Sequence, residues 1–277
     1  MTKELACFLL VLLVAAPRPQ ERGAAPSPLV TRTEKEALLL KGNIVDEGDT
    51  TTGSKFWRVT LGDGTRKHDA AIETSTLHDP SQRDYRFNVA AYELDKALEL
   101  NFVAPSVERA MKGQPAAFTW WVDDVLMNEQ VRRGKKIEPP DPDGWKKQMQ
   151  TVRVFDELIA NAYRNVSPAF YMAAIWDNLL ITKDWRIWLV DHTRAFATSR
   201  TLENPETLAQ CDRALLTKMR ELPREVIKER LEKYLTPEQL DALEVRRGLL
   251  VKHFAERIAL QGEGAVLYDL PSRQSSN

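Results

Sequence analysis

The segment of residues 180–196 constrains the fold of this chain more than any other. It contains a short apolar run, a polar turn at 183–184 and a second apolar run that ends at Asp191. This order predicts a β-hairpin. Asp177 and Asn178 stand just before its first strand. An Asn where the hairpin begins and an Asp where it ends can face one divalent cation, because hard cations prefer oxygen ligands.

Composition allows one globular domain or two tightly associated lobes. The chain has 277 residues, of which 43% are hydrophobic and 29% are charged. Its 39 basic and 40 acidic residues give a net charge of -1. No strong overall field therefore points to nucleic acid or to an anionic membrane as a partner.

The N-terminus predicts export. The apolar run at 5–16 is too short for a membrane span, which needs about 20 apolar residues, and it is followed by small residues and a stretch rich in Pro and Ala. We expect a signal peptide at 1–16, cleaved after Ala16, a periplasmic or extracellular protein, and no transmembrane span in the mature chain. The small residues at 23–25 offer a second cleavage position, and the alternatives to a signal peptide are an uncleaved anchor or a wrongly assigned start. Cleavage would leave only Cys211, which cannot form an internal disulfide and which we expect as a packed thiol in a helical stretch.

Hydrophobic periodicity divides the remaining chain into a β-rich part and a helical part, which is an α+β order. The predicted organisation is a linker at 17–35, an N-terminal lobe at 36–127, a Pro-rich loop at 128–144, a helical C-terminal lobe at 145–270 and a tail at 271–277.

Within the N-terminal lobe the pattern is strand-like from 38 to 74 and then predicts one helix and two further strands. The expected elements are a hairpin of 56–61 with 66–74, a helix at 85–100, and strands at 101–109 and 117–122. In the C-terminal lobe, apolar residues at helical spacing predict helices at 145–163, 205–222, 224–234 and 237–261. The last of these has a good start signal, with Thr236 as N-cap, Pro237 at N1 and Gln239 at N3.

This order and several motifs resemble the protein-kinase-like superfamily over roughly residues 38–270. The likeness is greatest to its atypical branch of HipA-type kinases, phosphoinositide kinases and secreted bacterial kinase-like proteins. The motifs that carry it are 86–95 followed by 100–106, 154–161, 177–180 and 189–196. The resemblance implies a two-lobed fold that binds ATP and Mg²⁺. It also implies that Asp191 and Asn178 hold the metal against the phosphates of the nucleotide.

The phosphate-binding positions depart from the pattern of this superfamily. Where the resemblance implies a phosphate-binding Lys, this chain has Glu73, so Lys55 and Lys67 are the candidates to replace it. The helix Glu that would orient this Lys is replaced by Asn88. Glu93 lies five residues further along the helix, about 500° round its axis, and so faces another direction.

The catalytic loop departs as well. Tyr163 stands where the resemblance implies a catalytic Asp, and its reference pKa near 10 makes it a poor proton acceptor at neutral pH. An apolar and aromatic insertion at 166–176 follows, and Asp177 beyond it is the candidate base. His192, next to Asp191, is expected to be a packed, hydrogen-bonded imidazole rather than a base.

Two functions follow from these residues. The first is an exported kinase-like phosphotransferase that uses ATP and Mg²⁺ and acts on a hydroxyl group of a protein, a lipid or a small molecule. The alternative is a catalytically inactive pseudokinase that serves as a binding or scaffold domain. A hydrolase has no support, since the chain has neither a Gly-x-Ser-x-Gly elbow nor a His-Glu-x-x-His helix.

Overall fold

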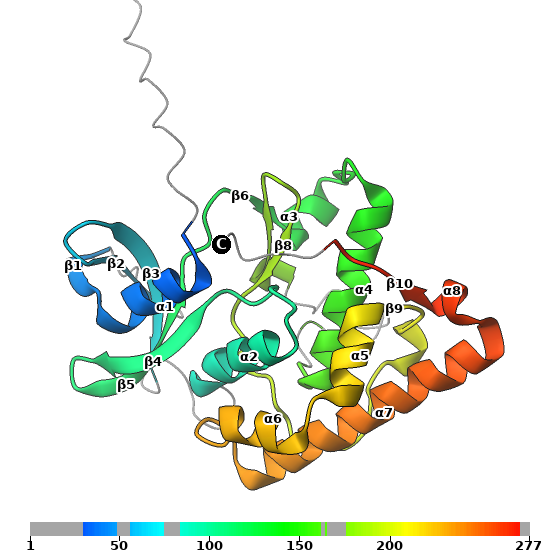
Figure 1. Cartoon of the computed structure of the whole chain (residues 1–277). Helices are drawn as coiled ribbons and strands as arrows, with labels where there is room; N and C mark the ends of the chain where they lie inside the picture. The colour runs from blue at the N-terminus through cyan, green and yellow to red at the C-terminus, as the bar shows by residue number, and fades with distance from the viewer. Residues whose placement is uncertain (1–29, 49–55, 75–83, 162–163, 165–175, 272–277) are drawn as a thin grey trace, which may run out of the picture.

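The computed structural model describes residues 30–48, 56–74, 84–161, 164 and 176–271. A sheet-rich N-terminal part leads into a mainly helical C-terminal part, as Figure 1 shows from blue to red. The predicted α+β architecture, with a small hairpin sheet inserted in the helical part, is confirmed.

The N-terminal part is built on a five-stranded antiparallel sheet in the order β1-β2-β3-β5-β4. Its strands are β1 (Asn43–Glu47), β2 (Trp57–Gly62), β3 (Lys67–Thr74), β4 (Ser106–Met111) and β5 (Gln114–Trp120). The predicted hairpin forms as β2 and β3. Alternate residues of β2, Val59 and Leu61, are buried on one face of the sheet, which explains the alternating pattern that predicted the strand. The strand predicted at 101–109 begins only after Pro105.

A helix, α1 (Arg32–Lys41), replaces the end of the expected linker and the start of the expected strand-like region, so both of those predictions are wrong there. The side chain of Thr31 accepts a hydrogen bond from the Glu34 backbone N–H, and the Glu34 carboxylate accepts one from the Thr31 backbone N–H. This capping box starts a helix whose Leu38 and Leu39 pack into the core of the large sheet.

The predicted N-lobe helix forms as α2 (Arg86–Ala97) and is confirmed. It contacts β4 and β5 on one side and a helix of the C-terminal part, α6 (Arg224–Leu231), on the other. α2 therefore connects the sheet to the helical part of the molecule (Figure 1).

A second, three-stranded antiparallel sheet contains the predicted hairpin, which is confirmed. Its strands are β6 (Val125–Asn128), β7 (Leu179–Thr182) and β8 (Ile187–Leu189). A short 3-10 helix, η3 (Trp176–Asn178), leads into β7. The chain passes from β5 of the large sheet to β6 of the small sheet through only residues 121–124, so the two sheets adjoin.

The remaining elements form the helical part. They are α3 (Glu129–Gly134), α4 (Pro142–Leu158), η4 (Pro205–Thr207), β9 (Cys211–Asp212), α5 (Arg213–Glu221), α7 (Pro237–Gln261), α8 (Glu263–Val266) and β10 (Leu267–Tyr268). The helix at 237–261 is confirmed, together with its Thr236 cap. Among the described residues, no helix has the length and apolar character needed to span a membrane.

Two loop and helix predictions for this part are wrong. The loop expected at 128–144 contains α3 and the start of α4, because Asn128 and Asp141 each cap a helix through their side chains. The single helix expected at 205–222 is divided into η4, β9 and α5. Cys211 is buried in β9, which pairs in parallel with β10, and Asp212 then caps α5.

Candidate functional site

A pocket of about 410 Å³ lies where the large and small sheets adjoin. β3 and β5 contribute to its wall from the large sheet, and β6, β7 and the two residues after β8, Val190 and Asp191, contribute from the small sheet. Its polar lining residues are Glu73, Thr119, Asn128, Asp177, Asn178 and Asp191. Oxygen-bearing side chains from separate parts of the chain therefore meet in one cavity.

The structure brings the predicted metal ligands Asp191 and Asn178 together in this pocket. The Val190 backbone N–H donates to the Asn178 carbonyl at 3.1 Å, which places the end of the hairpin beside its beginning. Asp177, the candidate base, also lines the pocket from η3. The hairpin register is the reason that residues separated in sequence share one cavity.

Asp191 has a constrained backbone. Its φ is 49°, in the left-handed region that non-glycine residues seldom adopt. Its carboxylate Oδ1 accepts a hydrogen bond of 2.5 Å from the Thr193 hydroxyl. On its N-terminal side, Arg164 Nη1 donates to the Val190 carbonyl at 2.9 Å. These hydrogen bonds thus hold Asp191 at the pocket in a backbone conformation that is unfavourable for a non-glycine residue without such support.

Arg164 is itself fixed by a buried ion pair. Its guanidinium Nε and Nη2 donate to the Asp156 carboxylate on α4 over 3.0–3.2 Å, and both side chains are almost fully buried. Burial raises the pKa of Asp156, against the opposing effect of the Arg164 charge. Through Arg164, the Asp156 side chain of α4 therefore anchors the chain just before Asp191.

His192 is packed, as predicted, but its buried Nε2 has no hydrogen-bond partner among the described residues, so the hydrogen bond expected of the ring is not found at that nitrogen. His192 is 1% exposed and its ring meets the Phe155 ring edge-on at 6.4 Å between centroids. Burial, with the nearby Arg164 charge, lowers the pKa of His192 well below its usual value, so the ring is neutral at pH 7. A buried, neutral ring of this kind is not poised to exchange protons with a ligand in the pocket.

The predicted phosphate-binding residues are not gathered in the same way. Glu73 lines the pocket from β3, whereas Lys67 is exposed at the other end of that strand, opposite Gly62, and does not line it. The structure therefore does not bring Lys67, one of the two candidates for the phosphate-binding Lys, to the pocket. Lys55 and Tyr163 lie outside the described residues, as do residues 166–175 of the expected insertion. Among the described lining residues there is no Lys, Arg or His.

Glu93 takes no part in the site. It forms ion pairs with Lys96, on the same helix, and with Arg230 of α6. It therefore faces away from the pocket, as its position round the helix predicted.

An aromatic wall was not predicted from the sequence. Phe56 and Trp121 line the pocket with their rings tilted at 58° and centroids 5.9 Å apart, and Arg58 stacks over Trp121 at 4.2 Å. Trp121 follows β5 directly and lies at the passage between the sheets. Its only sequence signal was the Trp-Trp pair at the end of a strand, which also suits a structural core.

No group of three His, Cys, Asp or Glu side chains arranged to hold a metal ion occurs among the described residues. Asp191 and Asn178 offer one carboxylate and one amide oxygen. This set suits Mg²⁺, which binds few protein ligands and takes its remaining ligands from water and phosphate. The residues present therefore fit a metal that arrives with a ligand rather than one held by the protein alone.

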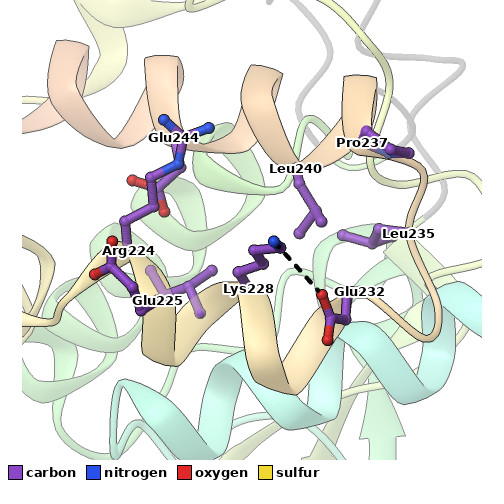
Figure 2. A pocket seen from close by; sticks show the side chains of 9 residues that line it. Arg224, Glu225, Lys228, Glu232, Leu235, Pro237, Leu240 and Glu244 are labelled. Carbon is purple, nitrogen blue, oxygen red and sulfur yellow. Dashed lines mark ion pairs between the residues drawn. The ribbon is translucent and has the colours of Figure 1, made fainter.

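A larger cavity, of about 800 Å³, lies between α6 and α7 and has a different character (Figure 2). Lys228 extends across it and pairs with Glu232 at 3.9 Å. Arg224, which also lines the cavity, forms an ion pair with Asp241 at 3.1 Å. Leu235 and Leu240 complete its apolar side. These ion pairs satisfy charges within the helical part, and the cavity lacks the convergent oxygen ligands of the pocket between the sheets.

No protein-family model matches this chain, and no curated protein matches it. Among solved structures, the proinflammatory kinase CtkA of Helicobacter pylori is similar, with a TM-score of 0.49 and 10% sequence identity. The match covers 78% of this chain and 97% of that chain. The assignment of the candidate site rests on its own geometry.

Proposed function

We propose that this protein is kinase-like and binds a nucleotide triphosphate together with Mg²⁺ in the pocket between its sheets. One observation carries the proposal: Asp191 and Asn178 meet in a cavity that has an aromatic side. The aromatic side suits a planar base, and the two oxygen ligands suit a metal bound to phosphates. When bound, Mg²⁺ would offset the negative charge of the phosphates.

We further propose phosphoryl transfer to a hydroxyl acceptor as the reaction. The bond from the terminal phosphorus to the leaving diphosphate oxygen breaks, and a bond to the acceptor oxygen forms. We assign Asp177 to take the proton of the acceptor, since it is a carboxylate on the same pocket and Asp191 is assigned to the metal.

A binding-only role is the second candidate, and Glu73 is the observation that favours it. A carboxylate stands where a phosphate-binding cation is expected, and two like unit charges 4 Å apart repel by about 4 kcal/mol at an effective dielectric constant of 20. Export, which we propose from the N-terminal sequence, also favours a binding role or an unusual phosphate donor, because ATP is scarce outside the cytoplasm.

Thermal unfolding with and without Mg-ATP tests the proposal, using the intact protein and Asp191→Ala. A ligand at 100 times its Kd stabilises the native state by about 2.7 kcal/mol, so the Tm of the intact protein should rise while that of Asp191→Ala should not. The absence of any shift in the intact protein would refute nucleotide binding. If the shift occurs, transfer of radiolabelled phosphate separates the enzyme from the binding protein.

A further inference from the structure

The peptide group that follows Asp191 is held by a residue of the N-lobe helix. The His192 backbone N–H donates to Asn88 Oδ1 at 2.7 Å, between positions 104 residues apart in sequence. Asn88 is on α2 and is only 3% exposed. The Asp84 backbone N–H, just before the same helix, donates to the Thr193 carbonyl at 2.8 Å. The start of α2 is therefore joined to the chain around Asp191 at two points.

These contacts complete the support of a strained residue. The peptide group before Asp191 is held by Arg164 through the Val190 carbonyl, and the one after it is held by Asn88. Both supporting side chains are buried. A left-handed φ in a non-glycine residue persists where its surroundings fix it, and hydrogen bonds on both sides of Asp191 provide that constraint.

The chemistry of Asn88 fits this task. Its Oδ1 accepts the hydrogen bond, whereas its Nδ2 is buried and has no acceptor among the described residues. The amide oxygen is therefore the atom through which Asn88 supports the His192 peptide group.

We propose that Asn88 is a positioning residue that aims Asp191 at the metal of the bound nucleotide through the His192 peptide group. The inference rests on the proposed function. It couples the position of α2 to the metal ligand by a neutral hydrogen bond. Residues that orient a metal ligand from behind commonly change metal affinity 10- to 100-fold when they are replaced.

The test is the Mg²⁺ concentration at which ATP produces half of its full thermal shift. Asn88→Leu removes the acceptor at similar volume, and it should raise this midpoint about tenfold. Asn88→Asp keeps an acceptor oxygen at the same place and should stay within about twofold of the intact protein. Asn88→Ser, whose hydroxyl is too short to reach the His192 N–H, serves if the Leu variant does not fold, and the same rise is expected.

Tyr92→Phe is the matched control on the same helix. The Tyr92 hydroxyl donates to the Glu36 carboxylate at 2.7 Å, which joins α2 to α1 rather than to the chain around Asp191. Its loss should lower the Tm without ligand and leave the Mg²⁺ midpoint unchanged. The inference is overturned if Asn88→Leu and Asn88→Ser behave in this way too. If the intact protein shows no Mg²⁺-dependent shift, the proposed function itself is refuted and the inference falls with it.

Discussion

Replacing Arg164 with Met should lower the free energy of unfolding, because the buried Asp156 carboxylate then has no charged partner. The Arg164 guanidinium makes three contacts of 3.0–3.2 Å with Asp156, and the side chains are only 1% and 3% exposed. In Arg164→Met the remaining side-chain donor to Asp156 among the described residues is Asn161 Nδ2 at 3.2 Å. Breaking a buried pair by removing one partner costs about 3–5 kcal/mol, and we expect this loss at pH 7.5.

The pH dependence of this loss follows from the direction of the Asp156 pKa. Burial already raises this pKa, and removing the Arg164 charge that opposes burial raises it further. A carboxyl whose pKa is higher in the folded than in the unfolded state contributes stability below its unfolded pKa, and this is lost as pH rises through the folded pKa. The intact protein loses stability in the same way up to its own folded Asp156 pKa. The deficit of Arg164→Met should therefore grow by about 1.4 kcal/mol per pH unit between the folded Asp156 pKa of the intact protein and the higher one of the variant.

Urea unfolding at pH 5 and pH 7.5 measures both parts of this prediction. The deficit of Arg164→Met relative to the intact protein should be clearly smaller at pH 5. The double variant Arg164→Met with Asp156→Asn, which has no buried charge, should recover most of the stability at pH 7.5. A deficit below about 1 kcal/mol, or one equal at both pH values, would refute the reasoning, because the unpaired charge is its source.

Three further predictions concern single sites. Cys211 is fully buried and burial raises its thiol pKa, so a protein carrying Cys7→Ser should react with a thiol reagent only in denaturant; rapid labelling of the native protein would contradict this. Thr236→Ala removes the N-cap of α7 and should lower the free energy of unfolding by about 1 kcal/mol in urea titrations, whereas an unchanged midpoint would show that the cap is unimportant. Glu73→Gln removes a carboxylate from the pocket and should strengthen Mg-ATP binding about tenfold by calorimetry; unchanged or weaker binding would mean that Glu73 does not repel the phosphates.

Elements with strong local patterns could be predicted from the sequence. α2 has apolar residues at spacings of three and four, α7 has a capping box, and the hairpin of β7 and β8 has two apolar runs round a polar turn. Each pattern lies within one short segment. The meeting of Asn178 and Asp191 could be predicted for the same reason, because the hairpin register alone brings its two ends together.

The other elements depend on contacts between distant segments, or on capping residues that an analysis of hydrophobic periodicity does not take into account. β9 exists because Cys211 and Asp212 pair with Leu267 and Tyr268, which no local window can show. α1 is specified by its capping box more than by its apolar pattern.

The contact of Asn88 with His192 joins two lobes, so the sequence showed only that an expected Glu was absent. The hydrogen bond made by the Asn88 amide depends on the packing of α2 against the chain after β8, which only the structure shows.

We propose that Asp191 and Asn178 hold the metal of a bound nucleotide. Crystals grown with Mn²⁺ and a non-hydrolysable ATP analogue would test it most directly, since Mn²⁺ can replace Mg²⁺ and is located by its anomalous scattering. The account predicts an anomalous peak within coordination distance of the Asp191 carboxylate and the Asn178 amide oxygen, with the base of the nucleotide against Trp121. A nucleotide bound with its metal elsewhere, or a pocket that remains empty at saturating ligand, would contradict it.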